Sequence, residues 1–142
     1  MMPLRNDRRR EAFLAVSSLG YGLLGLTYLL EDTLSRAQGF AWLPFDIGAD
    51  EMGWVWIVAA IIVAISAVLS DNHPRFVKWG FVSLIIPPAT WSLIFLFAWI
   101  LGDHPTGYIT TISYSMMAAW IWIVSAWPDS VTDGGSQGWT SR

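Results

Sequence analysis

Few side chains in this sequence have the types and spacing that chemistry requires. The two histidines, His73 and His104, each stand directly before a proline at the start of a long apolar run. Consecutive runs that cross a membrane begin on opposite sides, so these imidazoles cannot share a metal ion or a proton. A metal site needs several converging ligands, and we interpret each histidine as a helix-start residue at the membrane interface.

Acidic residues offer a second, weaker possibility for chemistry. Asp46, Asp50 and Glu51 lie close together and could bind a divalent cation loosely, but their spacing matches no calcium loop. The absence of cysteine excludes disulfides, thiolate metal sites and thiol catalysis. No serine-hydrolase, zinc-protease or phosphate-loop motif occurs, so the sequence predicts a protein that is not an enzyme and needs no cofactor or metal.

The composition indicates a membrane protein. The chain has 142 residues, of which 54% are hydrophobic and 13% charged, whereas soluble domains carry roughly 25% charged residues. The net charge is −3, and the basic residues do not gather on a face that could follow phosphates, so nucleic acid is not an expected partner.

Four apolar blocks without a charged residue must carry the fold, at 13–30, 54–70, 79–101 and 109–127. Each is close to the roughly 20 residues that cross a bilayer as a helix, and none alternates as a barrel strand would. Short connections place successive helices side by side in opposite directions. The sequence therefore predicts an all-α integral membrane protein with four antiparallel transmembrane helices in residues 13–127 and an outer loop at 31–53.

Lysine and arginine predict the orientation, because cytoplasmic segments carry an excess of them. Seven of the eight fall before the first block, between the second and third, or at the end of the chain; only Arg36 lies on the other side. Both termini are therefore expected to be cytoplasmic in a bacterial plasma membrane. They are a basic segment at 1–12 and a tail at 128–142, which is rich in Gly, Ser and Asp and expected to be disordered.

A cleaved signal peptide is an alternative interpretation of the first block. Three arginines precede it, and small residues follow it at Ser35 and Ala37. The apolar run is longer than the roughly 7–15 residues of a signal peptide, and Glu31, Asp32 and Arg36 crowd the cleavage position. A retained first span is favoured; cleavage would leave three spans.

Tryptophan is abundant, with ten residues in the chain. Its ring is apolar and its N–H needs a partner, so it favours membrane interfaces. The tryptophans at or near block ends are expected to be interfacial: Trp42, Trp54, Trp56, Trp79, Trp99 and Trp127.

Two adjacent prolines, Pro87 and Pro88, interrupt the third block. Proline removes a backbone donor and restricts the residue before it, which predicts a kink or a short break near the membrane midplane. Neighbouring helices can supply hydrogen bonds to the freed carbonyls, and the expected donors are the hydroxyls of Tyr21, Thr111 and Ser115. A static kink is favoured over a gating hinge or a cavity lining.

Small residues recur at helical spacing in the other three blocks. Such stripes let membrane helices approach closely, and we interpret them as packing within the bundle, with an oligomer interface as the alternative. The stripes are Ser18, Gly22 and Gly25 in the first block, Ala60, Ala64 and Ala67 in the second, and Thr111, Ser115 and Ala119 in the fourth.

The outer loop carries the aromatic and apolar residues Phe40, Trp42, Leu43 and Phe45 around Pro44. It could lie on the membrane surface or dock a partner protein, because exposed apolar patches mark either kind of contact.

The layout resembles small Trp-rich four-span membrane proteins of actinobacteria and their phages. The shared features are GWVW at 53–56, a short basic connection and KWG at 78–80. The resemblance implies no assigned activity, although a phage link would add lysis, superinfection exclusion or prophage defence as roles. The residues favour a non-enzymatic protein that contacts a membrane-protein partner as an accessory or modulator. The alternatives are a holin-like pore of several copies and a small neutral-solute channel.

Overall fold

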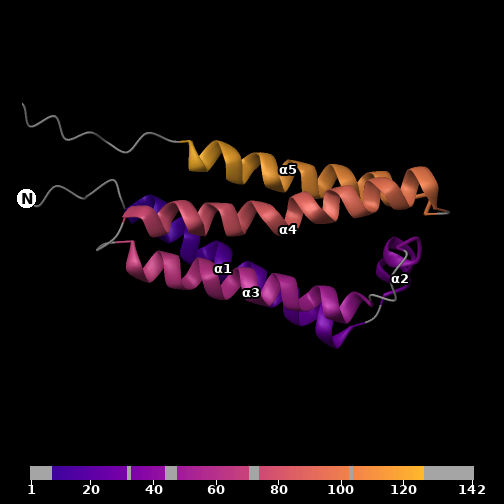
Figure 1. Cartoon of the computed structure of the whole chain (residues 1–142), viewed down its shortest axis with the longest axis horizontal. Helices are drawn as coiled ribbons and strands as arrows, with labels where there is room; N and C mark the ends of the chain where they lie inside the picture. Colours follow the sequence, from indigo (N-terminus) through magenta and orange to yellow (C-terminus); the bar gives the residue numbers. More distant parts are fainter. Residues whose placement is uncertain (1–7, 32, 44–47, 71–73, 103, 127–142) are drawn as a thin grey trace, which may run out of the picture.

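The computed structural model describes residues 8–31, 33–43, 48–70, 74–102 and 104–126. All regular structure in these residues is helical, as predicted. The five helices, labelled in Figure 1, are α1 (Arg8–Leu30), α2 (Leu34–Phe40), α3 (Ala49–Leu69), α4 (Pro74–Leu101) and α5 (Gly107–Ser125). Residues 1–7 of the predicted basic segment 1–12 and the whole predicted tail at 128–142 lie outside the described residues, as do Phe45, Asp46, His73 and Trp127.

Four of the helices are long and apolar enough to cross a membrane, which confirms the predicted number. They cover 19 to 27 residues each within α1, α3, α4 and α5, with mean hydropathy between 1.2 and 2.5. Three of them begin about five residues before the predicted blocks, because polar and charged residues can occupy the first turns of a helix at a membrane boundary. The fourth ends at Ser125, two residues before the predicted boundary.

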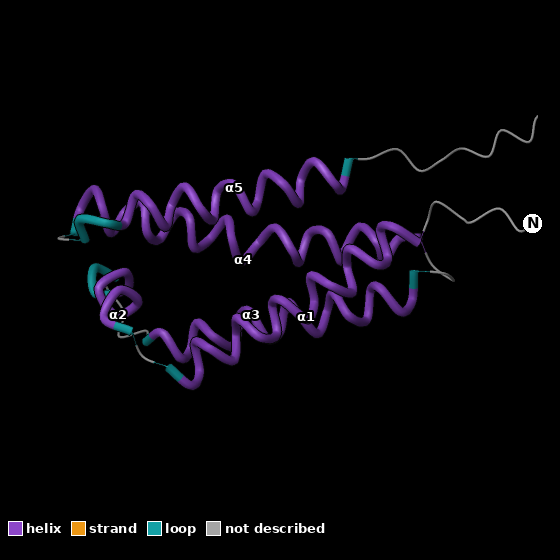
Figure 2. The backbone as a smooth tube through the Cα atoms, turned by 180° about the vertical axis from the view of Figure 1, so that it is seen from behind, coloured by secondary structure: helices purple, strands orange, loops and turns teal. Residues whose placement is uncertain are grey.

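The four long helices pack side by side in chain order, and side-chain hydrogen bonds also join the first of them, α1, to the last, α5. In the described residues, α1 packs on α3, α3 on α4 and α5 on α4. The start of α1 and the end of α5 lie at the same end of the molecule, where the Arg10 guanidinium donates to the Ser125 carbonyl at 2.9 Å. Toward the other end the α1–α3 and α4–α5 pairs diverge, and α2 lies in the wedge between them (Figure 2).

Helix α2 is held in this wedge by contacts of the Arg36 guanidinium and of the Phe40 ring. Arg36 donates to the carbonyls of Thr27 and Glu31 at 2.7 and 2.9 Å, which satisfies carbonyls at the end of α1 and places a positive charge beside its negative dipole end. Phe40 is 4% exposed and meets the rings of Trp91 and Phe95 edge-on. Arg36, the one basic residue in the sequence of the loop at 31–53, therefore stabilises the contact between α1 and α2.

Aromatic rings fill the centre of the molecule. Trp56 and Trp91 are fully buried, with ring centroids 5.1 Å apart, and Tyr21 meets Trp56 edge-on at 4.8 Å, a geometry that aromatic pairs favour. The expectation of an interfacial Trp56 is wrong. Helix α3 begins at Ala49, so Trp56 lies about two turns inside it.

Two glycines allow the closest approach of α1 and α3. A Cβ added to Gly25 would lie 3.0 Å from the Gly53 carbonyl oxygen, and one added to Gly53 would lie 3.1 Å from that of Gly25. On the predicted stripe, a Cβ at Gly22 would meet Ala60 at an ordinary 3.9 Å. Gly53 was not among the predicted packing residues, because it lies before the apolar block that was taken as the helix.

Candidate functional site

Helix α4 continues through Pro87 and Pro88 as one unbroken helix. The predicted short break is therefore absent, and a kink stays a prediction. Both prolines are almost fully buried. Pro88 has no N–H to offer the Leu84 carbonyl four residues earlier, and the Tyr21 hydroxyl donates to this carbonyl instead. One of the three expected donors thus replaces the missing helical bond.

The other two expected donors serve different contacts. The Thr111 hydroxyl donates to the Gly107 carbonyl within α5 at 3.0 Å, and the Ser115 hydroxyl lies 2.6 Å from that of Ser92. Ser92 also donates to the Thr111 carbonyl at 3.3 Å. The Thr111–Ser115 part of the predicted stripe therefore faces α4, where hydroxyl contacts join the two helices.

A second polar cluster lies where α1, α4 and α5 meet. The Trp91 indole N–H donates to the Tyr28 hydroxyl at 2.8 Å, and this hydroxyl lies 3.2 Å from that of Tyr114. Buried polar groups are costly unless paired, so this arrangement satisfies three aromatic side chains at once. Trp91, Tyr28 and Tyr114 belong to blocks far apart in the sequence, and no local pattern brings them together.

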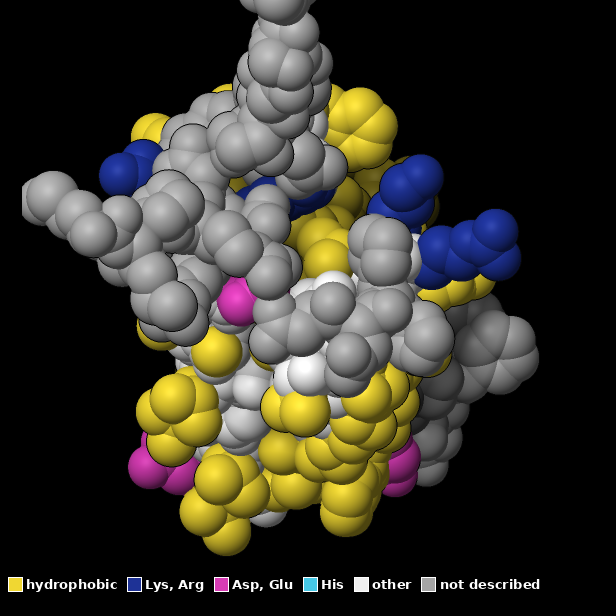
Figure 3. Space-filling view, turned by 90° about the vertical axis from the view of Figure 1, so that its left-hand side faces the viewer, with side chains coloured by type: hydrophobic (Ala, Val, Ile, Leu, Met, Phe, Trp, Pro, Cys, Tyr) yellow, Lys and Arg dark blue, Asp and Glu magenta, His cyan; other side chains and the backbone are white. Residues whose placement is uncertain are grey.

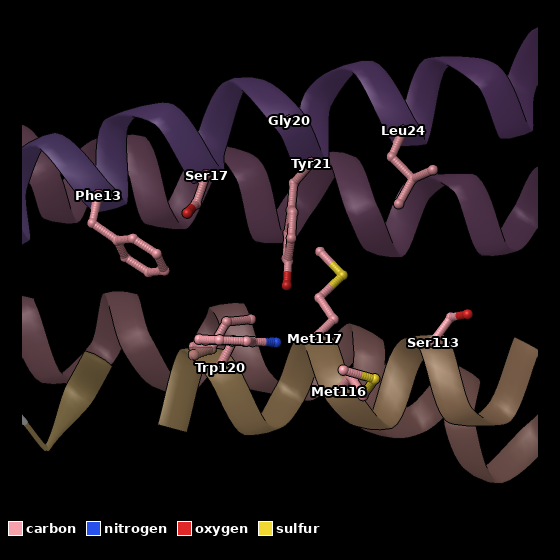
Figure 4. Close-up of a pocket in the computed structure, with 10 residues that line it drawn as sticks. Phe13, Ser17, Gly20, Tyr21, Leu24, Ser113, Met116, Met117 and Trp120 are labelled. Atoms are coloured by element: carbon pink, nitrogen blue, oxygen red, sulfur yellow. The ribbon is translucent and has the colours of Figure 1, made fainter. Parts of the chain in front are cut away.

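A groove separates α1 from α5 in the described part of the chain. Its volume is about 610 Å³. The wall on α1 consists of Phe13, Ser17, Gly20, Tyr21 and Leu24, and the wall on α5 of Ser113, Met116, Met117, Trp120 and Ile121. Figure 4 shows Tyr21 pointing from α1 toward α5 and Met117 pointing back toward α1.

The outer-loop residues pack against α4 in the structure. Phe40 is buried, and the Trp42 indole N–H donates to the Ile94 carbonyl at 3.1 Å while its ring contacts Phe97. Leu43 packs against the core. These contacts occupy three of the four side chains that were considered for a partner, so a docking role stays a prediction for the loop as a whole.

His104 lies just before the start of α5, and its position at a membrane interface stays a prediction. It is 3% exposed, and its ring lies 5.7 Å from that of Phe95. Neither ring nitrogen has a hydrogen-bond partner among the described residues. Within the same part of the chain, no group of three His, Asp or Glu side chains is placed to hold a metal ion.

Comparison with known protein families, with curated proteins and with solved structures finds no match to this chain. Its function must therefore be argued from its own residues.

Proposed function

We propose that the chain is a multi-pass protein of a bacterial plasma membrane, with four helices that cross in alternate directions and both termini in the cytoplasm. The charge distribution supports this orientation. Arg9, Arg10, Arg75 and Lys78 begin α1 and α4, and Figure 3 looks onto the end where Lys and Arg side chains gather. Cytoplasmic segments carry such an excess.

Within this membrane frame, the protein acts without catalysis, through contact with another membrane protein as an accessory or modulator. The observation that carries the proposal is the exposure of α5. In the most apolar stretch of α5 only 11% of the residues are buried, whereas the corresponding share is 28–39% in the other three long helices. Among the described residues α5 packs mainly on α4, which leaves most of its circumference for lipid or for a partner.

One stripe of α5 suits a partner helix. Its side chains recur every three or four residues, the spacing that lets two helices interlock, and each is more than half exposed. They are Ile109, Ile112, Met116, Trp120 and Ile123. The alternatives from the sequence fit the interior less well, since the fully buried Trp56, Trp91, Leu14, Leu84 and Val63 fill its centre. A pore would have to form between copies.

Photo-crosslinking in native membranes tests this proposal. A benzoylphenylalanine at Ile112 should capture one dominant foreign membrane protein. The same probe at Val68, which is 76% exposed on α3, should capture none and is the matched control. A ladder of this chain alone at Ile112 would contradict the accessory role and favour a pore of several copies, and equal capture at both positions would contradict a specific face.

A further inference from the structure

The groove between α1 and α5 has the dimensions of a ligand site. Its volume of about 610 Å³ falls within the roughly 300–1,000 Å³ of typical small-molecule pockets. On α1 its wall runs from Phe13 to Leu24, which is about 16 Å at 1.5 Å per residue. This length is close to half of a bilayer's hydrocarbon core of about 30 Å, so the groove has the length of one leaflet.

Polar contacts bound the groove at both ends. Next to the Phe13 end, the Arg10 guanidinium donates to the Ser125 carbonyl and joins α1 to α5. Beyond the Leu24 end, the hydroxyls of Tyr28 and Tyr114 join the same two helices at 3.2 Å. A transmembrane helix is about 10–12 Å wide with its side chains, so it could enter only by separating these contacts. A single flexible chain could enter between them.

The walls suit a hydrocarbon chain. They carry two methionines, Met116 and Met117, whose flexible side chains adapt to varied apolar shapes. A Cβ placed on Gly20 would meet nothing within 4 Å, so this glycine borders open space in the groove wall. The Tyr21 hydroxyl, which reaches into the groove in Figure 4, is already bonded to the Leu84 carbonyl.

The charge at one end indicates the head group. Arg10 lies one helical turn before Phe13, and Arg9 beside it is exposed. Basic side chains at a membrane surface attract anionic lipids, and guanidinium groups pair well with phosphate oxygens. We propose that the groove binds one acyl chain of an anionic phospholipid from the leaflet on the Arg10 side, with the phosphate beside Arg9 and Arg10. Met116 and Trp120 belong both to this groove wall and to the stripe of α5 proposed for a partner helix, so a lipid and a partner would share part of α5. The test of the lipid site uses the purified chain and needs no partner.

Native mass spectrometry of the detergent-purified chain tests the lipid site. With palmitoyl-oleoyl-phosphatidylglycerol added, the chain should retain one lipid, and it should retain phosphatidylcholine at least tenfold less well. Gly20→Phe should weaken phosphatidylglycerol retention at least tenfold by filling the groove. The matched control Ala15→Phe places the same ring at an exposed position of α1 outside the groove wall and should retain the lipid as the unmodified chain does.

A charge variant separates the head group from the acyl chain. Arg9→Gln keeps the Arg10–Ser125 contact, and it should lower the preference for phosphatidylglycerol over phosphatidylcholine several-fold. Equal retention of both lipids, or retention that Gly20→Phe leaves unchanged, would overturn the proposal. A dimer mass that Gly20→Phe abolishes would also overturn it, because the occupant would then be a second copy of the chain.

Discussion

Replacement of Tyr21 by Phe should lower the free energy of unfolding by about 1–3 kcal/mol, the cost of leaving a buried polar group unpaired. The Leu84 carbonyl has no helical donor because residue 88 is proline, and the Tyr21 hydroxyl donates to it in the core. Phe keeps the ring beside Trp56 and removes only the hydroxyl. Unfolding of the purified protein in mixed micelles, followed by circular dichroism, measures the difference.

The matched background for this substitution is Pro88→Ala. An alanine at position 88 restores an N–H that can donate to the Leu84 carbonyl, so Tyr21→Phe should then cost less than about 1 kcal/mol, with the difference appearing as a coupling free energy. An equal cost of Tyr21→Phe in both backgrounds would refute the claim that Tyr21 replaces the helical bond. Pro87→Ala, which restores an N–H donor for the Ser83 carbonyl and not for the Leu84 carbonyl, should leave the cost unchanged.

Gly53→Leu should destabilise the contact between α1 and α3 by about 1–3 kcal/mol or more, the usual cost of overpacking a close interface. The added Cβ would lie 3.0 Å from the Tyr28 Cβ and 3.1 Å from the Gly25 carbonyl oxygen. Neither of these atoms can move without shifting the α1 backbone. The same unfolding measurement should report the loss, together with proteolysis of the loosened helix pair.

Gly20→Ala is the control for the effect of glycine itself. Its Cβ meets nothing within 4 Å, and replacement of a mid-helix glycine by alanine stabilises a helix by roughly 0.5–1 kcal/mol. Gly20→Ala should therefore stabilise the protein slightly while Gly53→Leu destabilises it. If Gly53→Leu were as stable as the unmodified chain, α1 and α3 would not approach as closely as described.

The long helices could be predicted from the sequence because the bilayer imposes a length and an apolar composition on each of them. Their ends were less predictable, and this hid Gly53 and misplaced Trp56. Hydrophobicity could not locate α2, whose seven residues are held by Arg36 and Phe40 through contacts with other helices. Such contacts depend on tertiary structure, which a local pattern does not encode.

The groove could not be predicted at all, although the small-residue stripes indicated some of the packing. Its walls come from α1 and α5, which are nearly a hundred residues apart in the chain. Its shape also depends on α3 and α4, through which α1 and α5 are packed together. The hydrogen bond from Tyr21 to the Leu84 carbonyl could be predicted in part. A proline inside a membrane helix leaves a backbone carbonyl without its helical donor, and a neighbouring helix can supply one.

The membrane potential of expressing cells is the most direct test of whether the protein acts by contact or as a pore. A voltage-sensitive dye should report an unchanged potential in cells whose membranes hold a high, verified level of the full chain, because aromatic side chains fill the centre of the molecule. An abrupt loss of potential at that level would contradict the contact role and establish a membrane lesion.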